Sequence, residues 1–262
     1  MNNYYSPFDT DESGPKVFAQ LEEGYYILEL VGTQKRNTKS RQPVLVAELA
    51  PKARVIQSNG QQHLEDPNNE KPVESAFWLF SVPKDAANQR VTGIGYVKNN
   101  YASKSFSALM ECVSGYSKEE MKQRYSPESL AKQGIEMVVP VYTPNGTKDN
   151  PLIENVDEIT EQWRSFLHEF VVEENTDPDV KNHVLVKCFV TLKVGDKLDP
   201  QGNPYVNPEI GFVKGTFDPL FIPLSTREYE LYQEFVDSQS PGDVPSDEDN
   251  NDFELPGGGT RF

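Results

Sequence analysis

The clearest hydrophobic pattern in the chain is a strict alternation of positions over His183–Val194. Because successive side chains of a β-strand point to opposite faces, this alternation predicts a strand with two distinct faces. The apolar face consists of Val184, Val186, Cys188, Val190, Leu192 and Val194, and the other face of Leu185, Lys187, Phe189, Thr191 and Lys193. A strand with one core face and one solvated face is typical of an antiparallel sheet or barrel.

Other segments rich in aromatic and β-branched residues also predict strands. They are Tyr25–Val31, Val44–Leu49 with a continuation toward Ile56, Glu74–Val82, Ile135–Tyr142 and Tyr205–Lys214. Glu74–Val82 is apolar on both faces, which predicts a buried central strand that ends at Pro83. The turn residues of Gly195–Asn203 predict that Tyr205–Lys214 returns as the hairpin partner of the alternating strand.

Helices are predicted from residue spacing and from capping patterns. Phe106 begins an apolar stripe of helical period within Ala102–Val113, so we expect its ring to pack on the core. Ser117 and Ser225 each stand three residues before a glutamate, which is the capping-box pattern. Ser126-Pro127 starts a further helix. A longer amphipathic helix is expected from about Pro151 to Val172, with an apolar stripe of Leu152, Val156, Ile159, Trp163, Phe166, Leu167 and Phe170.

Two polar connections stand out between the predicted strands. Gly32–Gln42 is a basic turn region with four cations and no acidic residue, so it is either a phosphate-contacting finger or an ordinary solvated loop. Gln57–Val73 reads as a polar loop that is longer than most connections. The aspartates of Gly195–Asn203 lack the spacing of an EF-hand, and we therefore expect no calcium there.

The formal net charge of −16 is unevenly distributed along the chain. In residues 237–262 seven acidic residues face Arg261 alone, a balance of −6 that leaves −10 for the remainder. Between Lys35 and Arg54 six basic residues face only Glu48, a balance of +5. This distribution excludes a strongly basic nucleic-acid binder, but it allows a local basic groove on an acidic body.

The chain divides into three predicted parts: an arm over 1–23, a folded core over 24–236 and an acidic tail over 237–262. The tail has low hydrophobicity and high charge, which predicts disorder. Its candidate partner-binding residues are Asp247, Glu248, Asp249, Asp252, Phe253 and Phe262. Such a tail can enter a partner's basic-rimmed pocket, occupy the protein's own cationic groove in competition with phosphates, or serve only to solubilise the chain.

Cysteine usage and hydropathy bear on the compartment. Two cysteines make no disulfide framework, which favours a reducing environment. The first residues have neither the basic start nor the apolar run of a signal peptide. No apolar stretch approaches the roughly 18 residues that would cross a bilayer. We therefore expect a cytoplasmic protein with no membrane partner.

Gly93–Phe106 interleaves aromatic rings with lysines and contains no acidic residue. Rings that stack on bases and amines that neutralise phosphates are what a sequence-tolerant single-strand groove requires, although the same residues also suit a helix start. Together with the basic turn and the β-hairpin, this segment completes a set of nucleic-acid-binding candidates. They are Lys35, Arg36, Lys39, Arg41, Tyr96, Lys98, Tyr101, Lys104, Lys187, Phe189, Lys193, Phe212 and Lys214.

Signatures of catalysis are missing from the sequence. His63, His168 and His183 lie far apart and lack metal-ligand spacing. There is no glycine-rich phosphate loop and no nucleophile motif. We therefore predict a protein that is not an enzyme and needs no cofactor or metal. Scattered acidic residues leave a magnesium-dependent nuclease as the enzymatic alternative.

Short strands in hairpins, the basic turn at Lys35–Arg41, interleaved tyrosines and lysines, and the acidic tail ending in Phe262 together resemble single-stranded DNA-binding proteins of tailed phages. The resemblance implies an α+β fold built on an OB-like antiparallel β-barrel with helical insertions. It also implies that the tail recruits replication or recombination proteins and competes with DNA. This chain departs from the pattern at its tip, where Arg261 stands beside the terminal aromatic.

The hypothesis from the sequence is a protein that coats and protects single-stranded DNA during replication or recombination. Whether the bound single strand is DNA or RNA does not follow from the sequence. If the chain is phage-encoded, its location is the cytoplasm of the bacterial host. The alternative is a non-enzymatic structural or protein-interaction module, such as a virion or scaffold component.

Overall fold

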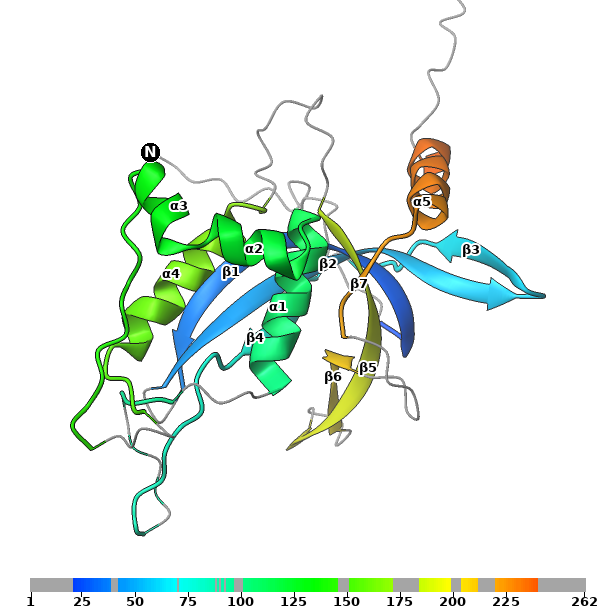
Figure 1. Ribbon diagram of the computed structural model, residues 1–262. Coiled ribbons are helices and arrows are strands. Elements are labelled where there is room, and N and C mark those ends of the chain that lie inside the picture. The colour runs from blue at the N-terminus through cyan, green and yellow to red at the C-terminus, as the bar shows by residue number, and fades with distance from the viewer. Residues whose placement is uncertain are drawn as a thin grey trace, which may run out of the picture.

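The computed structural model describes residues 21–38, 42–69, 71–87, 89, 91, 93–96, 101–145, 151–171, 184–198, 204–211 and 220–239. In this described part the protein is α+β, with seven strands in one antiparallel sheet and five helices (Figure 1). The predicted fold class is thereby confirmed at the level of an α+β protein with an antiparallel sheet. Most of the arm over 1–23 and of the tail over 237–262 lies outside the described residues.

Strands β1 (Gly24–Asn37) and β2 (Pro43–Ser58) form the long central hairpin of the sheet. Their register runs to the pair Asn37↔Pro43, with irregularities after Ile27 and after Leu30. The prediction that a loop begins at Gly32 is therefore wrong, because pairing with β2 keeps the basic residues of β1 in the strand. Only residues 38–42 are left to connect the two strands.

The predicted polar loop after β2 is in large part a second hairpin. Asn59 and Gly60 have φ angles of 53° and 76°, the left-handed values that a two-residue turn between antiparallel strands requires. The turn joins β2 to β3 (Gln61–Glu65), which pairs with the end of β2. The Asn59-Gly60 dipeptide is the sequence signal for such a hairpin, and the prediction of a loop missed it.

Strand β4 (Val73–Phe77) pairs with β2 and alternates between buried and exposed positions. The prediction of a strand over Glu74–Val82 that is buried on both faces is wrong, because β4 ends at Phe77 and Trp78 is 42% exposed. The predicted strand Ile135–Tyr142 is also wrong. Its backbone is instead held by the side chain of Asn155, which hydrogen-bonds to Val141 N at 2.8 Å and Val139 O at 2.9 Å.

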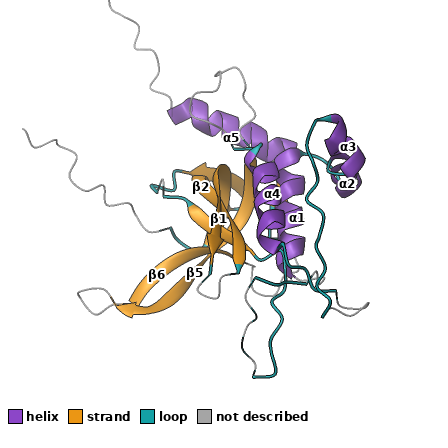
Figure 2. Cartoon of the chain, turned by 90° about the vertical axis from the view of Figure 1, so that its left-hand side faces the viewer, coloured by secondary structure: helices purple, strands orange, loops and turns teal. Residues whose placement is uncertain are grey.

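The predicted alternating strand is present as β5 (Leu185–Leu198), which pairs with β1, with β6 (Pro204–Gly211) and with the short β7 (Ile222–Pro223). Its apolar face is buried only as far as Val190. Beyond that residue the β5–β6 hairpin extends past the core, and Val194 is 63% exposed (Figure 2).

The sheet has the order β3-β2-β1-β5-β6, and β4 joins it at β2. Strands β1, β2 and β4 are neighbours in the sheet, with the short β3 inserted between β2 and β4 along the chain, and β5 returns after four helices to lie beside β1. This is the spatial order of a Greek key. Strands β4 and β6 lie near each other, but no backbone pairing joins them in the described residues, so the sheet is open there.

The capping patterns predicted where three of the helices begin. Ser117 and Glu120 form the capping box of α2, Ser126 caps α3 with Pro127 at its first position, and Ser225 bonds reciprocally with Glu228. The long predicted helix begins at Val156 instead of about Pro151 and ends at His168 instead of Val172. The helices are α1 (Tyr101–Ser114), α2 (Lys118–Arg124), α3 (Pro127–Lys132), α4 (Val156–His168) and α5 (Thr226–Gln239).

The two faces of the sheet are covered by different helices. The main core lies between the sheet and helices α1–α4, and Phe106 belongs to it as predicted. Trp163 packs against this core with its ring edge-on to Phe106, at a centroid distance of 6.0 Å. A second cluster holds Ile27 and Leu185 beneath Tyr232 of α5 on the opposite face. No helix in the described part of the chain is long and apolar enough to span a membrane.

Candidate nucleic-acid interface

Part of the predicted interface lies outside the described residues: Lys39, Arg41, Lys98, Phe212, Lys214 and the tail residues Asp247, Glu248, Asp249, Asp252, Phe253 and Phe262. Tyr101 begins α1, but its side chain is also outside the description. On β6 the described residues end at Gly211, which the β5–β6 register sets opposite Phe189. The described candidates are Lys35, Arg36, Tyr96, Lys104, Lys187, Phe189 and Lys193.

The two cations at the end of β1 both contact carboxylates of the protein itself. Lys35 Nζ lies 2.5 Å from Asp157 Oδ2 on α4. Arg36 donates from both terminal nitrogens to Glu74 of β4, at 2.6 Å each. These two hydrogen bonds raise the pKa of Arg36 and lower the pKa of Glu74. A phosphate that binds Arg36 would therefore compete with Glu74 for this guanidinium.

Arg36 lies on the side of β1, β2 and β4 that faces away from the main core. The register places Arg36 opposite Val44, and Leu45 opposite Phe77, so continuing the alternation sets Trp78 on the same face as Glu74. The exposed indole just after β4 and the guanidinium of Arg36 thus lie on the same side of the sheet. We call this surface, made of Gln34, Arg36, Glu48, Glu74 and Trp78, the β1–β2–β4 face.

Sequence reasoning missed Trp78 because its apolar neighbours suggested a strand that is buried on both sides. Two signals could have predicted that Trp78 is exposed. Glu74 and Ser75 are polar and Pro83 follows closely, and both features favour an edge strand over a central one.

A pair of aromatic rings joins β5 to β1. Phe189 is opposite Tyr25 of β1, and their rings meet edge to face with centroids 5.1 Å apart. Both side chains are half-buried. Lys193 lies farther along the same face and pairs with Glu209 at 3.2 Å, where both groups are well exposed. This surface, made of Tyr25, Phe189 and Lys193, is the β5 face.

Lys187, the remaining candidate of β5, is largely buried. Its Nζ lies 2.5 Å from Glu228 Oε1 on α5, and the two side chains are 17% and 10% exposed. Burial works to raise the pKa of Glu228, but hydrogen bonds from Lys187 and from Ser225 outweigh it and hold the pKa below its ordinary value. In the described structure Lys187 therefore joins α5 to the sheet.

The lowered pKa of Glu228 predicts an acid-dependent loss of stability. A carboxyl whose pKa is lower in the folded state stabilises the protein above its unfolded pKa, and this contribution is lost as the pH falls through the folded pKa. We expect the free energy of unfolding to decrease below about pH 4.5, the ordinary value for glutamate, and to decrease less steeply in Glu228→Gln. Urea denaturation at pH 7 and at pH 3 measures both; equal pH dependence in the two proteins would contradict the prediction.

The described candidates do not share one surface. Lys35 and Phe189 are at opposite ends of β1, because Phe189 pairs with Tyr25 and ten residues of strand span about 33 Å. Tyr96 is half-buried in a backbone bridge with Ser81. Lys104 is exposed on α1. The described rings and amines thus lie in separate patches at the two ends of β1, on the loop at Tyr96 and on α1.

The described residues include no group of three histidine, cysteine, aspartate or glutamate side chains placed as metal ligands. The Nδ1 atom of His168 lies 3.1 Å from Thr33 Oγ1, and His63 lies 3.4 Å from Glu65. Burial raises the pKa of the Cys112 thiol to about 12. A thiol of that kind stays protonated near neutral pH and is a poor nucleophile.

Comparisons with protein-family models, with curated proteins and with solved structures gave no match for this chain.

Proposed function

We propose that this protein binds single-stranded DNA through an OB-like barrel and coats it without strong sequence preference. The observation that supports this best is the Greek-key order β5-β1-β2-β4, extended by β6, which lies near β4. An OB fold is a five-stranded, partly open Greek-key barrel. In this assignment β3, β7 and the helices are additions to the barrel.

The location of the β1–β2–β4 face supports the same function. OB folds bind oligonucleotides on the face of their second and third strands and with the loops after their first and fourth strands. The corresponding strands here are β2 and β4, beside which Arg36 and Trp78 lie. The corresponding connections are residues 38–42, with Lys39 and Arg41, and residues 199–203. Trp78 would stack on a base, and the cations would neutralise phosphates.

The β5 face extends the proposed binding surface. Phe189 and Tyr25 supply two half-buried rings that meet edge to face. The exposed ion pair of Lys193 with Glu209 contributes little to stability, so a phosphate could replace the Glu209 carboxylate. Coating of DNA would thus use rings and cations at both ends of β1.

We predict that Trp78→Ala lowers the affinity for single-stranded DNA about 10-fold, because one base–aromatic stack contributes roughly 1–3 kcal/mol. Fluorescence anisotropy of a labelled oligothymidine with the full chain measures this change. Affinity should also fall with salt, with a log–log slope of about −0.7 for each phosphate contacted.

Tyr142→Ala is the matched control, since Tyr142 is another exposed aromatic residue and lies outside the sheet. We expect it to leave the affinity unchanged. Equal effects of the two substitutions would contradict a role for Trp78, and no binding by the unmodified chain at low salt would overturn the proposed function.

A protein-interaction module is the second candidate function. Val139, Val141 and Tyr142 are exposed by 71%, 51% and 59% and follow one another on the segment between α3 and α4. Neighbouring exposed apolar side chains favour contact with another protein. Failure to bind oligothymidine would leave this candidate as the better one.

A further inference from the structure

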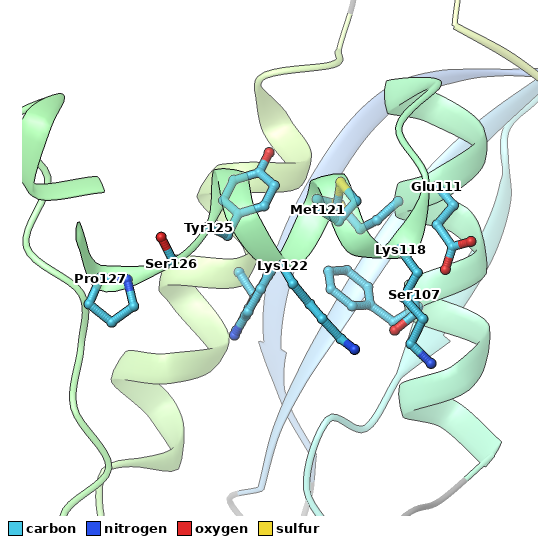
Figure 3. A pocket seen from close by; sticks show the side chains of 11 residues that line it. Ser107, Glu111, Lys118, Met121, Lys122, Tyr125, Ser126 and Pro127 are labelled. Atoms are coloured by element: carbon cyan, nitrogen blue, oxygen red, sulfur yellow. The ribbon is translucent and has the colours of Figure 1, made fainter. Parts of the chain in front are cut away.

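An apolar pocket with a volume of about 400 Å³ lies among α1, α2, the start of α3 and α4, and its lining residues all come from this helical part of the chain (Figure 3). Helices α2 and α3 are only seven and six residues long, so they cover the space between α1 and α4 incompletely. The apolar lining consists of Phe106, Met110, Met121, Tyr125, Pro127 and Trp163.

The mouth of this pocket has available positive charge. Lys118 and Lys122 line it together with Glu111, and Figure 3 shows both lysine side chains extending toward the same side. Lys104 lies one helical turn before Ser107, another lining residue. None of the three lysines has an ion pair with a described residue, in contrast to Lys35, Arg36, Lys187 and Lys193. The pocket therefore suits an acidic peptide with apolar side chains.

The chain itself contains a peptide of this chemistry after α5. Residues 240–262 hold six acidic residues and one arginine, and Phe253 and Leu255 alternate with Asp252 and Glu254. In an extended peptide the first two side chains point to one side and the two carboxylates to the other. The 14 residues from Gln239 to Phe253 can span up to about 48 Å.

We propose that the segment Asp252–Leu255 binds in this pocket of its own chain. Phe253 and Leu255 enter the apolar pocket, and the neighbouring carboxylates face Lys118 and Lys122. Attachment to the same chain raises the effective concentration of the segment to the millimolar range for a short flexible linker, so a weak site is sufficient. The bound segment is unavailable to other proteins, and a partner has to compete for it. This proposal does not depend on DNA binding.

Trp163 reports directly on the pocket that it lines. In the full chain with Trp78→Phe, Trp163 is the one remaining tryptophan, and acrylamide quenching of its fluorescence measures access to the pocket. We expect Phe253→Ser with Leu255→Ser to raise the quenching constant roughly twofold, because the covering apolar side chains are lost. Val244→Ser is the matched control, an apolar tail residue outside the binding segment, and it should have no effect.

Reversal of the charge at the mouth, in Lys118→Glu with Lys122→Glu, should raise the quenching constant by a similar factor. Combined with the tail substitutions it should add nothing, because both sets remove the same contact. An unchanged constant in the tail variant overturns the proposal, and that variant leaves the folded core intact. A change that depends on protein concentration between 1 and 50 μM, roughly the range in which weak self-association is seen, identifies a second copy as the source and overturns binding within one chain.

Discussion

Replacing Lys187 by methionine is expected to lower the free energy of unfolding by about 3 kcal/mol. The reason is that the Glu228 side chain is only 10% exposed and keeps its charge through the hydrogen bonds from Lys187 and Ser225. Methionine preserves the apolar stem of the lysine but leaves a buried carboxylate without its countercharge. The change should appear in urea denaturation followed by circular dichroism as a lower midpoint with an unchanged slope.

Two further variants test the cause of this loss. Lys193→Met removes a lysine of the same strand from an exposed pair, and such a pair contributes only about 0–1 kcal/mol. Lys187→Met combined with Glu228→Gln should recover much of the stability, because no unpaired charge is left buried. Equal losses in Lys187→Met and Lys193→Met would contradict the importance of the buried pair.

Lys187 also shows where sequence reasoning stops. The alternation of β5 correctly predicted that this lysine stands beside Phe189 on the face away from the main core. It could not identify Glu228, which is 41 residues away in the sequence and on a helix. Arg36 and Glu74, 38 residues apart, are a second example. A pattern assigns a cation to a face, whereas the position of its counterion depends on how distant elements pack.

Local signals predicted local structure well. The reciprocal serine–glutamate bonds and the Pro127 helix start depend on residues within one turn, and the β5–β6 hairpin depends on turn residues near its strands. The prediction of a long basic loop over Gly32–Gln42 was wrong because the length of β1 is set by its pairing with β2. The prediction that Glu74–Val82 is buried on both faces was wrong because Phe77 and Trp78 are equally apolar in sequence. Only tertiary packing decides which of them is covered.

These two neighbours therefore give the second large prediction: Phe77→Ala should lower the free energy of unfolding by about 4 kcal/mol, in the range for truncation of a buried phenylalanine. Phe77 is 1% exposed, and its ring centroid lies 5.6 Å from that of Phe106 on α1 and 5.9 Å from that of Phe221 before β7. Its loss removes contacts that join β4 to both. Thermal and urea denaturation measure the effect.

The companion substitutions separate packing from binding at adjacent positions. Phe77→Leu retains an apolar side chain and should cost less than about 1.5 kcal/mol if the core repacks around it. Trp78→Ala should cost less stability than Phe77→Ala, since Trp78 is 42% exposed and Phe77 only 1%, while it weakens DNA binding. Phe77→Leu should bind the oligonucleotide like the unmodified chain, because its side chain faces away from the proposed site. A loss of stability at Trp78 as large as that at Phe77 would mean that the two side chains do not point to opposite sides of the sheet. The β1–β2–β4 face would then lose its aromatic contact.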